Sequence, residues 1–199
     1  MEAIAPGEII ANKYRIEREI GRGGMGVVFA ALHVDLDQEV AVKILHEYAA
    51  YDQAAIARLL REARAAAKIP SNHVVRVMDV GALPEGGAYI TMELLQGRDL
   101  ADVLRLNGPL SVSEAVDYLI ETCDAVAAAH AAGIIHRDLK PANLFVSQAP
   151  DGTPIIKVLD FGVSKIIPKS GQSATTGELT QTGQIFGSPS YMSPEQLRS

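Results

Sequence analysis

Hydrophobic and polar positions alternate in short segments through the first ninety-five residues. Apolar runs bounded by Gly, Asp, Gln or Pro are typical of strands that pair in an antiparallel sheet. The strands predicted in this way are 14–20, 26–32, 39–45, 74–80 and 88–94. Between the third and the fourth, residues 51–68 repeat Ala, Leu and Ile at helical spacing, and Pro70 follows as a stop signal. The pattern predicts a five-stranded antiparallel sheet with one helix.

The pattern changes after Gln96. Residues 99–106 have helical spacing, and Ser111 with Glu114 has the form of an N-terminal cap for a long Ala-rich helix that ends near Gly133. Two further apolar segments contain strands, with a turn at 150–153 between them. We therefore expect an α+β fold with a boundary near residues 96–98, and a second part that is mainly helical.

Composition narrows the function classes. The 199 residues carry a net charge of −6, which argues against a protein that coats nucleic acid or an anionic membrane. Cys123 is the single cysteine, so an intrachain disulfide and a thiolate metal site are excluded, and a reducing compartment fits best. No run approaches the ~18 consecutive apolar residues that a membrane span requires. We expect a chain without a membrane segment. If it has an anionic ligand, that ligand binds at a local site rather than over a broad basic surface.

A glycine-rich sequence lies between the first two predicted strands. Residues 21–28 read GRGGMGVV, a GxGxxGxV pattern that includes Gly21, Gly23, Gly24 and Gly26. Because β-type sequence continues on both sides, the pattern favours a hairpin that closes over nucleotide phosphates rather than a dinucleotide-binding turn. The alternative is a flexible hairpin turn without a ligand.

One lysine stands in an apolar strand. Lys43 ends the sequence VAVK, and Glu62 in the following predicted helix is its natural partner. A buried ammonium is costly unless a carboxylate or a phosphate pairs with it. The alternative is an edge-strand lysine whose amine reaches water.

The sequence HRDLKPAN at 136–143 is more specific. Asp138 and Asn143 supply a carboxylate and an amide at the spacing used to accept a hydroxyl proton and to hold a divalent metal, and Lys140 can neutralise a phosphoryl group. Asp160, followed by Phe161 and Gly162, stands at the end of an apolar strand, where it can ligate Mg²⁺.

These motifs together resemble the eukaryotic-type protein kinase family. The glycine-rich loop, the VAVK lysine, the helix glutamate, HRDLKPAN, DFG and SPE at 193–195 occur in the family's order over nearly all of the chain from Tyr14 onward. Lys140 resembles the Ser/Thr branch, and the ending YMSPEQ is similar to its bacterial members. The resemblance implies a two-lobed kinase fold, with an N-terminal extension at 1–13, an N-lobe at 14–95 and a partial C-lobe at 96–199.

The resemblance also implies a role for each motif residue. Asp138 would be the catalytic base and Lys140 its neighbour at the phosphoryl group, while Lys43, paired with Glu62, would hold the α and β phosphates. Asn143 and Asp160 would bind Mg²⁺, with Mn²⁺ as an alternative ion. The nucleotide would contact Gly21, Gly23, Gly24, Gly26, Val28, Ala41, Lys43, Met92, Glu93, Leu95, Phe145 and Asp160. For the apolar members of this set, plain core packing is an equally weighted alternative.

Regulation is implied by Arg137, which precedes the catalytic aspartate. In the family this arrangement accompanies phosphorylation of the activation loop. Thr180 and Thr182 are the candidate sites, with Arg137 and Lys165 as phosphate ligands, and Ser188 would contact Asp138 and Lys140. The alternative is an unmodified loop rich in Ser and Thr.

We therefore expect an enzyme that transfers phosphoryl groups from ATP to Ser or Thr hydroxyls of protein substrates in signalling. It would be cytoplasmic, or the cytoplasmic part of a longer protein, without nucleic-acid partners, and could self-associate for autophosphorylation. Family members continue past the SPE motif through further helices, so Glu195 and the helix near 113–132 are expected to lack partners. The alternative is a catalytically impaired nucleotide-binding fragment or interaction module.

Overall fold

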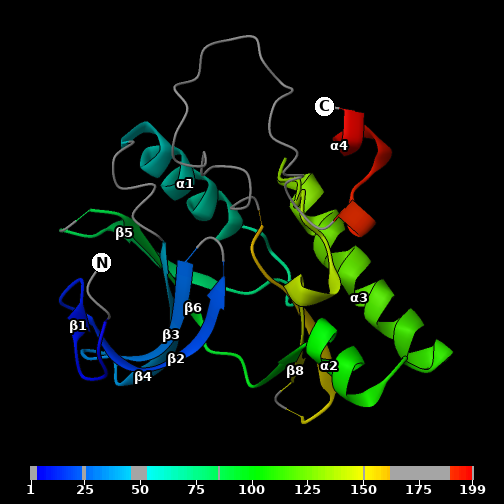
Figure 1. Ribbon diagram of the computed structural model, residues 1–199, viewed down its shortest axis with the longest axis horizontal. Coiled ribbons are helices and arrows are strands. Elements are labelled where there is room, and N and C mark those ends of the chain that lie inside the picture. The colour runs from blue at the N-terminus through cyan, green and yellow to red at the C-terminus, as the bar shows by residue number, and fades with distance from the viewer. Residues whose placement is uncertain are drawn as a thin grey trace.

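Two groups of elements make up the fold. The computed structural model describes residues 4–23, 26–45, 53–84, 86–149, 151–161 and 189–198. In Figure 1, a large sheet with one helix above it lies on one side, and the remaining helices with a small sheet lie on the other. This is the expected division into a sheet-rich and a mainly helical part.

The large sheet has six strands in the order β1-β2-β3-β4-β6-β5, with every neighbouring pair antiparallel. Its strands are β1 (Ile9–Ile10), β2 (Tyr14–Gly23), β3 (Gly26–His33), β4 (Gln38–Leu45), β5 (Val77–Ala82) and β6 (Ala88–Glu93). The sequence predicts five of them and misses β1. Ala11 and Asn12 adopt positive φ angles of 52° and 57°, which turn the chain back so that Ile10 pairs with Tyr14. A strand of two residues is too short to show a periodic pattern.

The register of the sheet decides which residues share a face. Val28 is opposite Lys43, and Lys43 is opposite Ile90, so these side chains project from the same side. Helix α1 (Gln53–Ala66) packs against this side through Ile56 and Ala63, which form a core cluster with Ile90. The other side carries a second apolar cluster that includes Tyr14, Phe29 and Val42. Lys43 therefore lies on the face that α1 partly covers.

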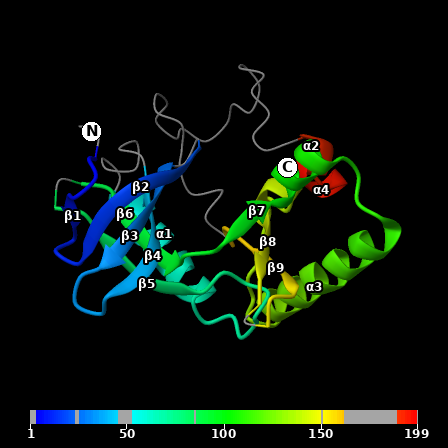
Figure 2. The same cartoon turned by 90° about the horizontal axis from the view of Figure 1, so that it is seen from below.

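The second group begins at Gly97. A three-stranded sheet in the order β7-β8-β9 contains β7 (Gly97–Asp99), β8 (Leu144–Gln148) and β9 (Pro154–Val158). The helical segments are α2 (Leu100–Asn107), α3 (Val112–Ala131), η2 (Pro141–Asn143), η4 (Pro189–Tyr191) and α4 (Pro194–Arg198). Figure 2 shows β7–β9 between the large sheet and α3. Ser111 and Glu114 form the reciprocal capping box expected at the start of α3.

Backbone hydrogen bonds join the two groups. Val75 N donates to the Val158 carbonyl at 3.0 Å, and Val158 N donates to the His73 carbonyl at 2.7 Å. The sequence predicts a strand from residue 74, but β5 begins at Val77 because the preceding residues pair with β9 instead. The connection between α1 and β5 is therefore fastened to the second group.

One face of α3 is exposed although it is apolar. Val112 is 82% exposed, Leu119 59% and Ile120 56%, and Val116 lies in the same row. Their spacing of three, four and seven residues places them on one side of the helix. None of the helices within the described ranges, α3 included, combines the length and the hydrophobicity needed to cross a membrane.

Candidate active site

The glycine-rich segment forms the hairpin between β2 and β3. Gly23 is opposite Gly26, and Gly21 is opposite Val28. A Cβ atom on Gly26 would collide with the Ile44 carbonyl of the neighbouring strand. Gly26 therefore lets β3 approach β4 closely beside Lys43, whereas Gly24 lies outside the described residues.

Lys43 is buried on β4 and pairs with the aspartate of the DFG sequence. Its side chain is 8% exposed, and Nζ lies 2.6 Å from Asp160 Oδ1. The ion pair with Glu62 that the resemblance implies is absent, since Glu62 takes part in no ion pair among the described residues. A buried ammonium requires a carboxylate, and Asp160 supplies it here.

Asp138 is held within residues 136–143, called the catalytic loop here after the resemblance, by two neighbours of the same motif. Lys140 Nζ lies 2.9 Å from Asp138 Oδ2. Asn143 Nδ2 donates to the Asp138 carbonyl at 2.7 Å and to Oδ2 at 3.2 Å. The ammonium of Lys140 and the amide of Asn143 therefore both hold Oδ2 of the Asp138 carboxylate. All three residues lie within six positions of the sequence. Its geometry suits a base that acts on a positioned hydroxyl.

His136 connects the catalytic loop to the segment before Asp160. It is 3% exposed, its Nε2 lies 2.8 Å from the Leu159 carbonyl, and its ring packs edge-on against Phe161 at a centroid distance of 4.8 Å. The Asp138 N–H donates to Nδ1 at 3.3 Å, so the proton of the neutral ring belongs on Nε2. Burial lowers the pKa of His136 below its usual 6.5, and the hydrogen bond to Leu159 only partly opposes this.

Asp160 is tied to the same loop through the residue before it. The Leu159 N–H donates to the Asn143 carbonyl at 2.9 Å, while its carbonyl contacts His136. Asp160 itself has a φ of 58°, an uncommon value for a residue other than glycine. Such strain persists where the surroundings hold it, and it clusters at functional sites.

The donor set fits a divalent metal. Both hydrogen bonds of the Asn143 amide use Nδ2, which leaves Oδ1 as an oxygen ligand, and Lys43 contacts only Oδ1 of Asp160. Mg²⁺ prefers oxygen ligands and commonly binds through one or two protein groups together with phosphates and water. The described residues contain no group of three or more His, Cys, Asp or Glu that would hold a metal by itself. Asn143 and Asp160 therefore suit a metal that arrives with phosphate.

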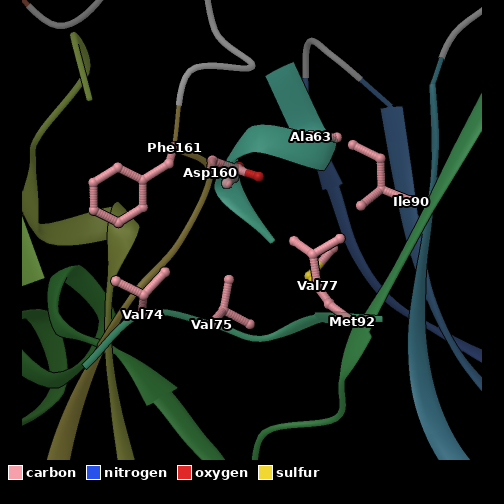
Figure 3. Close-up of a pocket in the computed structure, with 9 residues that line it drawn as sticks. Ala63, Val74, Val75, Val77, Ile90, Met92, Asp160 and Phe161 are labelled. Carbon is pink, nitrogen blue, oxygen red and sulfur yellow. The ribbon is translucent and has the colours of Figure 1, made fainter. Parts of the chain in front are cut away.

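A small apolar cavity lies behind these residues. Figure 3 shows Ala63 of α1, Val77 of β5, Ile90 and Met92 of β6, and Asp160 around it. Phe161, whose ring also packs against His136, completes the wall. Met92, one of the residues expected to contact the nucleotide, borders the same cavity as Asp160. A shift in the position of α1 relative to the sheet would therefore alter the packing around Asp160.

The expected adenine-contacting residues lie on both sides of the junction between the two groups. Val28 and Ala41 come from the face of the large sheet that carries Lys43, and Phe145 comes from β8. Leu95 lies between β6 and β7. Glu93 turns its side chain to Lys157 Nζ at 2.9 Å and to Arg76 N at 2.8 Å, which fixes the connection between the groups.

Several sequence-predicted residues cannot be placed. Lys165, Thr180, Thr182 and Ser188 lie outside the described residues, so the phosphorylation hypothesis stays a prediction. Glu195 is exposed on α4. Sequence reasoning assigned no role to His136 or to Gln196. His136 could have been found because it opens the HRDLKPAN motif.

Comparisons with known proteins agree with this geometry. The family described as "Protein kinase domain" matches residues 14–199. "Serine/threonine-protein kinase pkn3" of Myxococcus xanthus is 40% identical over 96% of this chain and 35% of its own length. "Probable serine/threonine-protein kinase PknB" of Lactococcus lactis is 43% identical over 96% of this chain and 29% of its own length.

A solved structure supports the same assignment. The kinase domain of Mycobacterium tuberculosis PknI superposes with a TM-score of 0.72 at 29% identity, over 82% of this chain and 63% of that one. The chain thus spans about a third of the length of the curated relatives named above, which are bacterial. Because the family match covers nearly the whole sequence and the fold agrees, the chain belongs to the protein kinase family.

Proposed function

We propose that this chain is the catalytic part of a Ser/Thr protein kinase that transfers the γ-phosphoryl group of ATP to Ser or Thr hydroxyls of protein substrates. The observation that carries the proposal is the arrangement at Asp138, where Lys140 and Asn143 hold a carboxylate in a fixed orientation. The names of the bacterial relatives support the choice of Ser/Thr acceptors.

Asp138 accepts the proton of the acceptor hydroxyl, and Lys140, whose Nζ lies 2.9 Å from Asp138 Oδ2, neutralises charge on the phosphoryl group as it moves. Lys43 can leave Asp160 and bind the α and β phosphates. The phosphates then pair with the Lys43 ammonium, and the metal pairs with the Asp160 carboxylate. Backbone N–H groups of the hairpin at Gly21, Gly23 and Gly26 cover the phosphates.

Asn143 Oδ1 and Asp160 would hold Mg²⁺, which neutralises phosphate charge when it is bound. Mn²⁺ would fit the same oxygen ligands. In the adenine site, the Glu93 N–H already donates to the Arg76 carbonyl at 3.0 Å, so adenine would meet the Glu93 carbonyl and the backbone of Leu95.

A second candidate is a nucleotide-binding interaction module without turnover. The ion pair between Lys43 and Asp160 favours it. In active protein kinases the lysine forms an ion pair with the helix glutamate, and the DFG aspartate binds the metal. The proposed enzyme must exchange these partners when nucleotide binds, whereas the module need not.

The test uses the full-length protein with labelled ATP, Mg²⁺ and a generic protein substrate. We expect phosphate on Ser and Thr, and a Mg²⁺-dependent rise in melting temperature with ATP that Lys43→Met removes. As a matched control, Lys68→Met changes an exposed lysine and should leave both results intact. A thermal shift without phosphate transfer would favour the interaction module, and no shift would refute both candidates.

We further propose that Thr180 and Thr182 are autophosphorylated and that Arg137, whose side chain is exposed, is one ligand of the phosphate. Peptide mass spectrometry of the active protein, before and after phosphatase treatment, checks this. Unmodified threonines in a fully active protein would reject it.

A further inference from the structure

The first turn of α4 contacts the backbone of the catalytic loop. Gln196 Nε2 donates a hydrogen bond to the Arg137 carbonyl at 2.7 Å, although 59 positions separate the two residues. Arg137 immediately precedes Asp138. We propose that Gln196 is a positioning residue that fixes the peptide group between Arg137 and Asp138, and through it the orientation of the Asp138 carboxylate. The inference rests on the proposed function of Asp138.

The side chain of Gln196 is itself held in one orientation. The Ser193 N–H donates to Gln196 Oε1 at 3.1 Å, and the Gln196 N–H donates to Ser193 Oγ at 3.3 Å. This reciprocal arrangement is a capping box, with Gln196 in the place where Glu or Gln is usual. Because Oε1 accepts from a backbone N–H, the amide nitrogen must be the atom that faces Arg137. The donor is therefore preset before any substrate binds.

The peptide group that Gln196 contacts is held at both ends. Its carbonyl, on Arg137, accepts from Gln196, and its N–H, on Asp138, donates to His136 Nδ1 at 3.3 Å. His136 is in turn buried and fixed to the Leu159 carbonyl. Two opposite hydrogen bonds define the plane of this peptide, and the plane determines the direction in which the Asp138 side chain leaves the backbone.

This restraint is needed because Arg137 is strained. Its φ of 68° lies in the left-handed region, where the Cβ atom of an arginine comes too close to the backbone. If the carbonyl lost its donor, the backbone could relax toward negative φ and rotate the peptide plane. Asp138 would then leave Lys140 and Asn143, which hold its carboxylate at 2.9 and 3.2 Å. Gln196 thus couples the segment 189–198 to the catalytic base.

Three substitutions separate the donor from the cap. Gln196→Glu keeps an acceptor for the Ser193 N–H but places an oxygen against the Arg137 carbonyl. Gln196→Met removes both functions without adding charge, and Gln196→Lys restores a donor. Gln148→Met makes the same chemical change at an exposed position on β8 and serves as the control.

The experiment measures kcat, KM for ATP and melting temperature in the full-length protein. We expect kcat to fall about ten-fold in Gln196→Glu and Gln196→Met, because a ten-fold loss corresponds to the net free energy of one hydrogen bond. KM for ATP should stay unchanged. Gln196→Lys should recover most of kcat, and Gln148→Met should match the wild type. Unchanged kcat in the first two variants, or a loss that follows the melting temperature and that lysine does not rescue, would overturn the proposal.

Hydrogen exchange provides a readout that does not depend on activity. The Asp138 amide should exchange faster in Gln196→Met than in the wild type, while the amides of α3 should keep their rates. Equal exchange at Asp138 would overturn the positioning role. A wild-type protein that transfers no phosphate, yet shows the faster exchange in the variant, would refute the proposed function and leave the contact between α4 and the loop established.

Discussion

The two halves of the candidate site differ in how far they are assembled. On the catalytic loop, Asp138 already contacts Lys140 and Asn143, and its backbone is held by His136. On the large sheet, Lys43 contacts Asp160 rather than Glu62. The first half is built from residues a few positions apart in sequence, whereas the second needs α1, β4 and the DFG segment to align. Contacts between residues close in sequence form at a smaller cost in chain entropy, because the loop that they close is short.

The buried lysine of the sheet-side half nevertheless has a partner in this arrangement. A buried ammonium will pair with whichever carboxylate is within reach, and Asp160 satisfies Lys43 at 2.6 Å. Nucleotide phosphates would offer Lys43 a second partner and would release Asp160 for a metal. The difference between the halves therefore suggests that ligand binding completes the site on one side only.

The largest effect is expected from the assembled half. Asp138→Asn removes the proposed base but keeps the size of the side chain, so phosphoryl transfer should fall by roughly 10²–10⁴ while nucleotide affinity stays nearly the same. The measurement is kcat together with the ATP dissociation constant in the full-length protein. Asp124→Asn, on the exposed side of α3, is the control and should behave as the wild type. An active Asp138→Asn variant would remove Asp138 from the mechanism.

The second prediction tests which carboxylate pairs with Lys43 in the absence of nucleotide. Asp160→Asn leaves a buried ammonium without its partner and should lower the free energy of unfolding by roughly 1–3 kcal/mol. Glu62→Gln breaks no ion pair and should change it by less than about 0.5 kcal/mol. Denaturant unfolding of both variants checks this. A larger loss in Glu62→Gln than in Asp160→Asn would reverse the comparison.

Much of this comparison could be anticipated from the sequence, but not its central contact. The motifs single out Lys43, Asp138, Asn143 and Asp160, the family resemblance implies their roles, and Ser111 with Glu114 predicts the capping box of α3. The choice of Asp160 over Glu62 depends on how α1 packs on the sheet, which periodicity does not encode.

The contact of Gln196 with Arg137 shows the same limit. Ser193 and Gln196 have the three-residue spacing of a capping box, but this short segment was not singled out from the sequence. The hydrogen bond from the Gln196 amide nitrogen to a carbonyl 59 positions away is a tertiary contact, which the local pattern does not predict. Likewise, β1 depends on two positive φ angles at Ala11 and Asn12, residues for which such angles are uncommon.

The third prediction concerns the rearrangement itself. If Lys43 moves to Glu62 when nucleotide binds, Glu62→Gln should lower kcat/KM for ATP about ten- to hundred-fold, the contribution of a charged hydrogen bond. Steady-state kinetics at varied ATP concentration checks this. Glu121→Gln is not a suitable control, because the Glu121 carboxylate accepts a hydrogen bond from the Ile156 N–H. Glu114→Gln is suitable, since glutamine can also serve in its capping box. Kinetics unaffected by Glu62→Gln would show that Lys43 needs no helix partner.

The smallest effect is a pH dependence of stability from His136. Its pKa is lowered in the folded protein, so below about pH 6.5 the unfolded chain binds a proton that the folded chain does not. The stability that His136 provides is complete above its unfolded pKa and is lost as the pH falls below it, with a slope of at most about 1.4 kcal/mol per pH unit. Unfolding between pH 5 and 7.5 should show this slope in the wild type.

Replacement of His136 by Asn should flatten that slope, even though it lowers stability at every pH. His130→Gln, on the exposed side of α3, should keep the slope of the wild type. An identical pH profile in His136→Asn would show that another group controls acid stability.

The single cysteine lies beside the exposed row of α3. Cys123 is exposed and follows Leu119 by four positions and Ile120 by three, so its sulfur lies at the edge of the apolar surface. A fluorophore attached through this thiol would be the only cysteine-linked label in the 199 residues. Its emission would report, without any engineered residue, whether that surface meets water or protein.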